Sequence, residues 1–412
     1  MRTVFVIGIG MTCFGRHLDQ SCSDLAAKAV GEAMNDAGIS PKDINIAFYA
    51  NVAQGVIEGQ FGIRGSHALR PLGVNGAPII DVENACTSST TAFNLAYTQI
   101  ASGCADVALA VGVEKLNTED PAKKFAVFNN PLDLSAAKAF VDKYSALVED
   151  ILPPPHVKTD EGMRSVFMDI YSVNARLHMK RYGTTWEQMA KVCSKNHQHS
   201  TMNPRSQFQH AISLEEVLAA RIISWPLTLP MCAPVSDGAT AAVLCSSDVV
   251  RRFNVSRAVK VYASMMQGGS DRDITDLEHS ALRLAATKAY DSAGVGPMDM
   301  DLAEVHDASA FAEISQVELL QLCPLGEGGP LALSGATSLG GSIPVNVSGG
   351  LESKGHPIAA TGLAQVHELV EQLRGETGAR QVQGARLGIA ANSGGFLGVE
   401  EAVSCVTILG RA

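Results

Sequence analysis

Two stretches of the chain share one pattern of apolar and polar positions. Residues 24–51 read DLAAKAVGEAMNDAGISPKDINIAFYAN, and residues 280–307 read SALRLAATKAYDSAGVGPMDMDLAEVHD. In each stretch, apolar residues recur at helical spacing up to an Ala-Gly pair, and a Pro/Asp turn and an apolar run follow. The pattern predicts a helix that glycine caps, a tight turn and a buried strand. Because the turn residues keep the same offset in both copies, the chain contains an internal duplication.

A second, weaker correspondence links the segments that follow Cys86 and His356. After Cys86, the stretch TSSTTAFNLAYTQIASG predicts a helix that leads to the strand DVALAVGVEK. After His356, the stretch TGLAQVHELVEQLRG predicts a helix that leads to the strand ARLGIAANSGG. Two α/β halves of this kind predict mixed sheets covered by helices. Both Cys86 and His356 would then lie at strand-to-helix junctions.

Residues 119–224 break this pattern. They contain Pro153-Pro154-Pro155, the polar run KNHQHSTMNPRSQ and helical segments such as SVFMDIYSVNARLHMKRYG. We interpret them as an insertion packed on the first half that forms a lid or a binding surface, since long loops in compact domains usually have such a role. A long connection without function is the alternative.

Composition and charge exclude several classes of protein. Of the 412 residues, 46% are apolar, 18% charged and 5% aromatic, and 38 are glycines, a profile typical of a tightly packed α/β protein with an aliphatic core. The formal net charge of −10 argues against nucleic-acid binding, which requires clustered cations. No apolar stretch approaches the roughly 20 residues that cross a bilayer, so we expect no membrane association.

The cysteines indicate a reducing compartment. There are nine, an odd number, and no Cys-x-x-Cys pair, so neither a disulfide framework nor a metal site is expected. The short apolar N-terminal run is interrupted by Gly8 and Gly10, which is typical of a strand and a loop rather than of a signal peptide. We therefore expect a cytoplasmic protein.

Cys86, in the segment VENACTSSTTAF, is the first candidate for chemistry. A cysteine at the start of a helix has a lowered thiol pKa, because the helix dipole favours the thiolate. The alternative is a buried cysteine that acts only as a small apolar residue.

Two histidines are the other candidates. His356 lies in Gly355-His356-Pro357, where glycine permits a tight loop and proline suits a first helical turn. A histidine held there can take a proton from a nearby thiol. His306, followed by Asp307, ends the apolar strand LAEV, and functional residues often lie at strand ends. Taken alone, each histidine has a structural role as its alternative.

With the repeat, these residues resemble the thiolase superfamily, in particular its sterol-carrier-protein-X-type (lipid-transfer-protein-like) branch. The resemblance covers nearly the whole chain and extends to CAPVSDGATAAVL (232–244), KNHQHSTMNP (195–204), LCPLGEGG (322–329) and NVSGGLESKGHPIAATGLAQ (346–365). It implies an α/β thiolase fold, with two duplicated βαβαβαββ halves in a five-layered α-β-α-β-α arrangement. The first half would comprise residues 1–118 and 225–255, the loop domain residues 119–224 and the second half residues 256–412.

The resemblance also implies a role for each candidate. Cys86 would attack a carbonyl and become acylated, and His356 would be the base that activates it. His306, where most thiolases have an asparagine that holds a water, would stabilise the enolate oxygen of the thioester together with His356. The backbone N–H groups of Cys86 and Gly394 would form the other oxyanion hole. Preorganised donors of this kind contribute roughly 3 kcal/mol each in a transition state.

The chain departs from the family where a second acid/base cysteine is expected. Most thiolases have it in a C-terminal Cys-x-Gly motif, but here the residues are Asn392-Ser393-Gly394. The sterol-carrier-type branch has it in His-Asp-Cys-Phe, but here Ala308 takes its place. Neither Asn392 nor Ala308 transfers protons near neutral pH. Three explanations stay open: a water or His306 delivers the proton, a loop-domain residue such as His156 does so, or the reaction differs.

The family comparison thus leaves three hypotheses. The first is Claisen-type thiolysis of a bulky aromatic, branched or steroid-derived 3-oxoacyl-CoA through a Cys86 acyl-enzyme, with coenzyme A as co-substrate and no permanently bound cofactor. The second is a retro-aldol lyase acting on a β-hydroxyacyl-CoA. The third is an inactive thiolase-fold scaffold subunit. Retention of Cys86 favours the first, since the lyases do not need that thiol.

The resemblance implies partners as well. Thiolases pair through their N-terminal halves, so a homodimer is expected. Relatives in this branch often work with a small subunit that carries an OB-fold and a zinc ribbon. The glycine-rich segment LCPLGEGGPLALSG (322–335) is either a partner or substrate surface or a plain loop.

Overall fold

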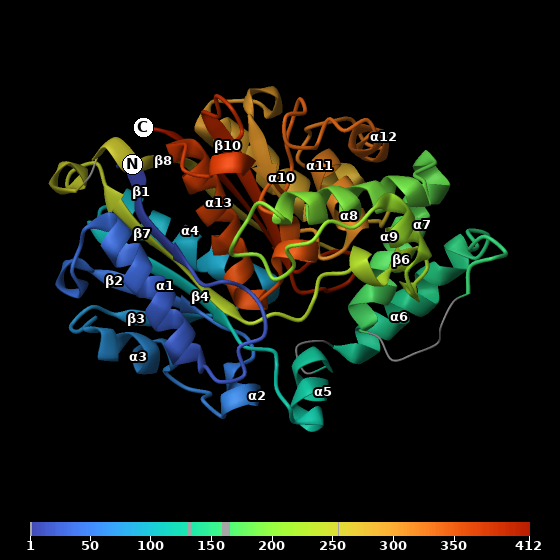
Figure 1. The fold of residues 1–412 in the computed structure, drawn as a ribbon. Coiled ribbons are helices and arrows are strands. Elements are labelled where there is room, and N and C mark those ends of the chain that lie inside the picture. The colour runs from blue at the N-terminus through green and yellow to red at the C-terminus, as the bar shows by residue number, and fades with distance from the viewer. Residues whose placement is uncertain (1, 130–132, 159–164, 254) are drawn as a thin grey trace.

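A mixed sheet runs through the molecule. The computed structural model describes residues 2–129, 133–158, 165–253 and 255–412 (Figure 1). Its strands are β1 (Val4–Met11), β2 (Ile46–Ala50), β3 (Ile79–Val82), β4 (Val107–Glu114), β5 (Ile222–Ser224), β6 (Leu227–Thr228), β7 (Gly238–Ser246), β8 (Val259–Gly268), β9 (Leu302–Glu304), β10 (Leu387–Gly394) and β11 (Val403–Arg411). Nine of them form one sheet in the order β3-β2-β4-β7-β1-β8-β11-β10-β9, and β5 and β6 form a separate hairpin.

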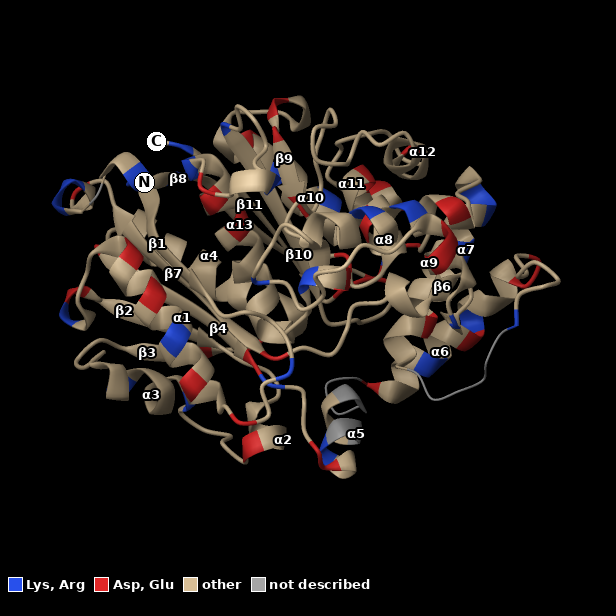
Figure 2. Ribbon diagram, viewed as in Figure 1, with Lys and Arg blue, Asp and Glu red and all other residues tan. Residues whose placement is uncertain are grey.

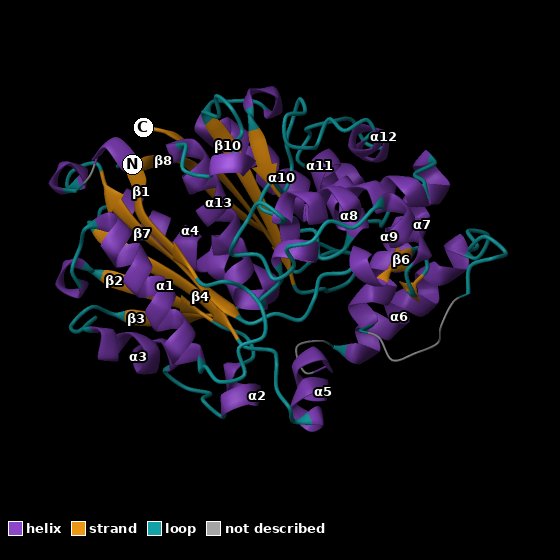
Figure 3. Ribbon diagram, viewed as in Figure 1, coloured by secondary structure: helices purple, strands orange, loops and turns teal. Residues whose placement is uncertain are grey.

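Helices cover this sheet on both sides (Figure 3). They are α1 (Cys22–Ala37), α2 (Gln54–Glu58), α3 (Arg64–Leu69), α4 (Ser88–Ala101), α5 (Pro121–Asn129), α6 (Leu134–Ser145), α7 (Val166–Tyr182), α8 (Trp186–Ser200), α9 (Leu214–Ala219), α10 (Ala281–Ala293), α11 (Ala310–Leu319), α12 (Gly328–Leu333) and α13 (Thr361–Arg374).

The internal duplication predicted from the sequence is present. α1 ends at Gly38, with φ 67° and ψ 34°, and α10 ends at Gly294, with φ 69° and ψ 34°, so both helices stop at a left-handed glycine. In the turn that follows, the carboxylate of Asp43 accepts a backbone N–H at 2.9 Å, and that of Asp299 accepts one at 2.7 Å. Both copies then enter a strand, β2 or β9, as expected.

The two halves are joined edge to edge. β1 pairs with β8 in antiparallel orientation, with Val4 opposite Val261, so the strands of both halves belong to one hydrogen-bonded sheet. Within the first half, β2 pairs in parallel with both β3 and β4. Within the second half, β9 pairs in parallel with β10.

The helices α4 and α13 lie in the layer between the two halves (Figure 1). The strands are buried on both faces, as β4 illustrates: Ala108 and Ala110 pack in the central layer, whereas Leu109 and Val111 pack on the side of α1. On the far side of the second half, α10 packs on β8 and β11. The helix and sheet layers agree with the thiolase arrangement that the resemblance implied.

The helix α8 of the insertion packs against the second half, whereas Val127 of α5 packs with Ala53 and Ile57 of the first half, so the prediction that the insertion packs on the first half was correct only in part. Met189 and Cys193 of α8 share a buried cluster with Phe311 and Ile314 of α11. The same helix sends Lys195 to Glu313, so polar as well as apolar side chains join it to the second half. Parts of the predicted loop domain, residues 130–132 and 159–164, lie outside the described residues. The β5–β6 hairpin crosses the predicted limit between residues 224 and 225.

Charged residues lie mainly on the outer helices and loops, and most of the sheet is without charge (Figure 2). Of the described helices, none is long and apolar enough to span a membrane. Part of the glycine-rich segment 322–335 forms the short helix α12, which packs beside α8.

Candidate active site

Cys86 lies in a tight turn between a strand and a buried helix. A 3-10 turn at Ala85–Thr87 follows β3, and α4 begins directly after it. Ala85 has a φ of 48°, in the left-handed region that residues with a Cβ seldom adopt, so the backbone is strained next to the thiol. The hydroxyl groups of Thr87 and Ser88 hold the turn, donating to Asn84 O and Ala85 O at 2.6 Å each.

The end of β10 lies against this turn. A Cβ atom placed on Gly394 would be 2.5 Å from the backbone nitrogen of Thr87 and 2.7 Å from the carbonyl oxygen of Asn84. Only glycine permits such a close approach. The backbone of Gly394 therefore lies next to the turn that carries Cys86. Both residues line the same cavity.

Hydrogen bonds fix both the position and the tautomer of His356. Its backbone N–H donates to Ser236 Oγ at 2.9 Å. Its Nδ1 lies 2.7 Å from the hydroxyl of Thr361, which donates its own proton to Pro357 O at 3.0 Å. Because that hydroxyl has only one proton, Nδ1 must be the protonated nitrogen of the ring. Nε2 is then an acceptor, and it lies 3.4 Å from Cys86 Sγ.

His306 is held in the opposite tautomer. Its Nδ1 accepts the backbone N–H of Ser393 and the amide of Asn392, each at 3.3 Å. The Asn392 amide oxygen lies 3.3 Å from the Thr90 hydroxyl, which also has Thr87 O as an acceptor at 3.1 Å. Nε2 of His306 therefore carries the proton. This buried donor has no hydrogen-bond partner among the described residues.

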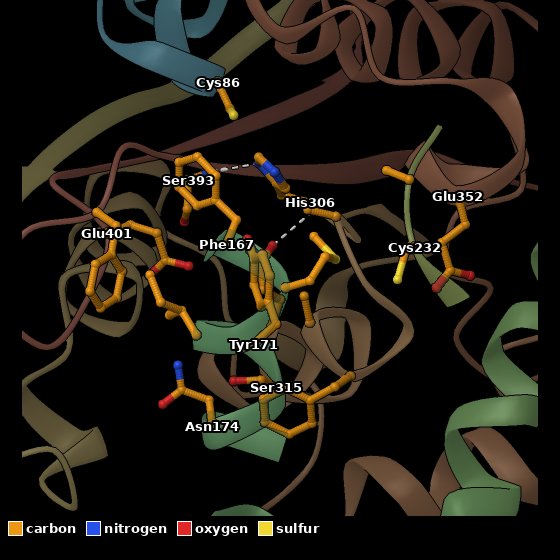
Figure 4. Close-up of a pocket in the computed structure, with 18 of the residues that line it drawn as sticks. Cys86, Phe167, Tyr171, Asn174, Cys232, His306, Ser315, Glu352, Ser393 and Glu401 are labelled. Carbon is orange, nitrogen blue, oxygen red and sulfur yellow. Dashed lines mark hydrogen bonds between the residues drawn. The ribbon is translucent and has the colours of Figure 1, made fainter. Parts of the chain in front are cut away.

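The structure brings Cys86, His306 and His356 together. One ligand-type atom from each lies within 4.8 Å of the others, and the two imidazole rings are 5.2 Å apart at their centroids. They come from three segments far apart in the sequence and line one cavity, in which Figure 4 shows Cys86 and His306. A thiol, a hydrogen-bond acceptor and an unpaired donor thus face the same space.

The predicted direction of the Cys86 pKa was wrong. Burial, and to a smaller extent the negative charges of Glu114 and Glu401, raise the pKa of this thiol to about 12. Burial also lowers the pKa of His356 to about 4. The helix dipole does not prevail, because Cys86 lies in the 3-10 turn before α4 and faces a largely apolar cavity. At neutral pH both groups are uncharged.

Asp307, next to His306, ties the two histidine segments together. Its carboxylate accepts the backbone N–H groups of Leu351 at 2.7 Å and Glu352 at 3.3 Å, in the π-helical turn Gly350–Lys354 that precedes His356. Sequence reasoning noted Asp307 only as a strand end. Its buried contacts could not be recognised, because they depend on a segment more than forty positions away.

The cavity in front of Cys86 has a volume of about 1500 Å³. Its walls combine the insertion, the second half and the Cys86 turn. Many of the side chains are large and apolar or aromatic, among them Phe167, Met168, Tyr171, Phe311 and Phe396. Figure 4 shows Phe167 and Tyr171, both from α7 of the insertion, facing the side of Cys86 and His306.

The residues at the altered acid/base positions differ in their surroundings. Ala308 lines the cavity beside His306, whereas the buried Asn392 serves to orient His306. His156, which we considered as a proton donor from the insertion, is exposed in a turn after the proline run and is not part of the cavity wall. The structure thus does not support that suggestion, since the His156 side chain is exposed.

The comparison with known families fits this geometry. Residues 4–217 match the family model described as "Thiolase, N-terminal domain", and residues 263–411 match "Thiolase C-terminal domain-like". This chain belongs to the thiolase family. As a thiolase it is an acyltransferase.

Several thiolase relatives are similar over nearly the whole chain. Sterol carrier protein 2 from Homo sapiens is 37% identical over 96% of this chain and 70% of its own length. An acetyl-CoA acetyltransferase from Methanothermobacter thermautotrophicus is 37% identical over 96% of this chain and 97% of its own. Benzoylsuccinyl-CoA thiolase subunit BbsB from Thauera aromatica is 34% identical over 93% and 92%.

Solved structures share the thiolase fold. A structure titled "Ltp2-ChsH2(DUF35) aldolase" superposes with a TM-score of 0.76 at 21% identity, covering 99% of this chain and 98% of that one. Human mitochondrial 3-ketoacyl-CoA thiolase in complex with CoA has a TM-score of 0.67 at 17% identity, covering 100% and 98%.

The residues of this thiolase can be compared with the needs of two kinds of ligand, a divalent metal ion and an anionic nucleotide. Cys86, His306 and His356 are of the types that bind soft divalent metals, and their ligand atoms are close enough together to do so. An anionic nucleotide would need cations, and Lys180 and Arg181 at the end of α7 line the same cavity; Lys180 is in an exposed ion pair with Asp150 at 2.8 Å. Arg272 also lines it, but its guanidinium is paired with Glu400 at 2.9 Å.

Proposed function

We propose that this thiolase cleaves a bulky 3-oxoacyl-CoA by Claisen-type thiolysis, in the degradative direction, through an acyl group on Cys86. The contact between Cys86 Sγ and His356 Nε2 at 3.4 Å carries the proposal. A thiol beside an imidazole that can accept its proton, with the other imidazole nitrogen fixed, is the arrangement of an activated nucleophile.

In the first step the Cys86 proton passes to His356 Nε2 as sulfur attacks the C3 carbonyl. The raised pKa of the thiol and the lowered pKa of the imidazole mean that no stable ion pair forms beforehand. Charge therefore develops only during attack. Such a mechanism depends on groups that stabilise the oxyanion at that moment.

Two oxyanion sites are proposed. The N–H groups of Cys86 and Gly394 would hold the oxygen of the tetrahedral adduct, supported by the close approach of Gly394 to the Cys86 turn. Nε2–H of His306, together with His356, would hold the thioester enolate oxygen. The unpaired Nε2–H in a buried wall supports this role, because an unpaired buried donor costs free energy unless a ligand satisfies it.

The acyl group is proposed to be large, apolar and free of a second anionic group. The cavity volume of about 1500 Å³ and its aromatic walls support the first two properties. The third follows because Arg272, the cation beside the acyl region, is neutralised by Glu400. One relative is named for benzoylsuccinyl-CoA, which supports an aromatic acyl group in this branch. Coenzyme A would enter as a co-substrate, with its phosphates near Lys180 and Arg181.

The test is a panel of aromatic, branched, steroid-derived and straight-chain CoA esters, assayed with and without free CoA on wild-type protein and Cys86→Ala. Thiolysis predicts cleavage that needs free CoA and is lost in Cys86→Ala. Cleavage of β-hydroxyacyl-CoA that persists in Cys86→Ala without CoA would indicate the retro-aldol lyase. No turnover of any ester would favour the scaffold.

We further propose a homodimer formed through the first half. β3 is the edge strand of the sheet there, and Ile80 on it is 43% exposed, near Phe61 and Ile63 at 76% and 66%. An exposed apolar edge strand is a surface that requires a partner. The measurement is the mass in solution of the wild type and of Ile80→Lys, which is expected to be monomeric.

A small OB-fold/zinc-ribbon subunit is proposed as a second partner. The support is that one relative is itself named a subunit and that one structural neighbour is titled with a second component. The domain limits at residues 118/119, 224/225 and 255/256 also remain proposals. Co-expression with the product of an adjacent small gene, followed by co-purification, tests the subunit.

A further inference from the structure

The proposed thiolysis still lacks a group that protonates the α-carbon of the leaving thioester. Asn392 occupies the position where thiolases have a cysteine, and its amide is engaged with Thr90 and His306. The neighbouring Ser393 hydroxyl is paired with Ser404 at 2.9 Å. The candidates for this work are therefore the other acids on the cavity wall.

Glu401, just before β11, lies on that wall together with Cys86, His306 and Tyr171 (Figure 4). Its carboxylate is near enough to Cys86 for its charge to raise the pKa of the thiol, and it raises the pKa of Tyr171 as well. The three groups thus line the same cavity and influence one another electrostatically.

The position of Glu401 is fixed by its neighbour. Glu400 is buried and receives Arg272 Nε at 2.9 Å, the backbone N–H of Ser270 at 2.8 Å and that of Ala281 at 3.0 Å. The backbone is also anchored on the other side, where Gly269 N–H donates to Ala402 O at 2.9 Å. The two adjacent carboxylates therefore differ in their surroundings. Glu400 forms an ion pair with Arg272, whereas Glu401 points to the cavity.

The Glu401 carboxyl group has no hydrogen bond from another residue within the described parts of the chain; only its own backbone N–H interacts with it. Burial is the main cause that raises its pKa, and the charge of Glu400 adds to the effect, whereas Arg272 opposes it. These causes shift the pKa of the Glu401 carboxyl group upward, in the direction that a proton donor to a substrate carbon requires.

Two other candidates fit less well. Burial raises the pKa of the Tyr171 phenol well above its usual value, which makes it a weak acid. Glu352 also faces the cavity and has an unpaired, buried oxygen. It lies beside Cys232, on the opposite side of His306 from Glu401 (Figure 4). Its nearest charges are those of Asp307 and Glu313, behind the site.

We propose that Glu401 is the second acid/base residue of this enzyme and replaces the missing cysteine; the inference rests on the proposed thiolysis. When the C2–C3 bond breaks, its electron pair goes to C2, and the Glu401 carboxyl proton moves to that carbon. The shortened CoA ester leaves, and the acyl group stays on Cys86. The Glu401 carboxylate then takes the thiol proton of incoming CoA, whose sulfur attacks the acyl group. Cys86 leaves as a thiolate and regains its proton from His356.

The test is exchange of the C2 hydrogens of the shortened CoA ester with D₂O, measured by mass spectrometry. Exchange requires acid/base transfer at C2 but no net cleavage. Glu401→Gln should slow it at least 10²-fold, the lower range of what a positioned acid/base group contributes. Glu401→Asp keeps a carboxyl group, so its exchange rate should be at least tenfold higher than that of Glu401→Gln. The matched control is Glu215→Gln, an exposed carboxylate on α9, which should exchange at the wild-type rate.

Alkylation of Cys86 by iodoacetamide monitors the integrity of the site and should be at least as fast in Glu401→Gln as in wild type, because loss of a negative charge that raises the pKa of the thiol favours the thiolate. The proposal is overturned if Glu401→Gln exchanges within threefold of wild type, or if Glu401→Asp is no faster than Glu401→Gln. Failure of the proposed function is a separate result: wild-type protein would then form no acyl adduct on Cys86, whatever Glu401 does.

Discussion

The Thr361 hydroxyl lies 2.7 Å from His356 Nδ1 and decides which nitrogen of that ring faces Cys86. Since the hydroxyl is committed to Pro357 O, it accepts from Nδ1–H and leaves Nε2 free as a base. One residue, five positions after the histidine and in the first turn of α13, thus prepares the imidazole for proton transfer.

Thr361→Val removes this acceptor while nearly keeping the volume of the side chain. The ring can then adopt the other tautomer, so we expect kcat to fall roughly 10²-fold, the lower end of what a positioned base contributes. Thr361→Ser is the control, because it keeps the hydroxyl and should stay within a few-fold of wild type. Equal rates for Thr361→Val and wild type would contradict the assignment of the tautomer.

The pKa values of Cys86 and His356 predict an unusual pH dependence. With the pKa of the thiol at about 12, alkylation of Cys86 by iodoacetamide should accelerate continuously from pH 6 to 10 and reach no plateau. With the pKa of His356 at about 4, the imidazole loses its function as a base only when the pH falls towards that value. A profile of kcat/KM against pH should therefore have no acid limb near 6.5. A plateau of alkylation below pH 8 would instead indicate a stable thiolate.

Gly394→Ala tests the contact between β10 and the Cys86 turn. Its Cβ would lie 2.5 Å from Thr87 N, a backbone atom, so the turn must shift. We expect activity to drop by more than 10²-fold, because displacement of the turn also disturbs the N–H groups proposed for the oxyanion. Gly31→Ala in α1 is the control, since its Cβ would meet no atom within 4 Å. It should keep full activity and unfold at a slightly higher temperature, as expected for alanine in a helix.

The ion pair between Lys195 and Glu313 connects the insertion to the second half. The Nζ and Oε1 atoms are 2.5 Å apart, both side chains are buried, and Lys195 also donates to Val345 O at 2.8 Å. Lys195→Met leaves the Glu313 charge buried without its partner, which should lower the free energy of unfolding by about 3–5 kcal/mol. Urea denaturation measures this. The double variant Lys195→Met/Glu313→Gln should recover much of the loss, and a double variant as unstable as the single one would contradict the explanation.

Much of the fold could be predicted from the sequence, because its signals are local. The Ala-Gly helix ends at Gly38 and Gly294 appear where the pattern predicted them, and each is followed by the expected turn and strand. The junction positions of Cys86 and His356 also follow from strand and helix patterns. Their proximity was inferred from the family resemblance, and the structure brings them together.

The buried polar network was not recognisable in the same way. The sequence shows the segment that begins at Lys195 only as a polar run, whereas Lys195, Asn196, His197 and His199 are all buried in the structure. Their partners, such as Glu313 and Asn346, are more than a hundred positions away. A polar pattern does not distinguish solvent from a distant carboxylate, and this is also why the packing of α8 on the second half was not predicted.

The Cys86 pKa was mispredicted for a related reason. The sequence places a cysteine before a helix, which favours the thiolate, but it does not reveal how apolar the opposing wall is. That wall comes from α7 and from the loop before β11, and its burial effect outweighs that of the dipole. Glu401 was missed because no family motif contains it and its neighbours are known only from the fold.

The central claim is that cleavage proceeds through an acyl group on Cys86, and intact-mass spectrometry of acid-quenched reactions tests it most directly. Wild-type protein mixed with a bulky 3-oxoacyl-CoA in the absence of free CoA should gain the mass of the acyl group, at Cys86 and in about one copy per chain. Addition of free CoA should remove the adduct, and Cys86→Ala should never form it. Rapid cleavage of the ester with no mass gain on the wild-type protein would contradict the account.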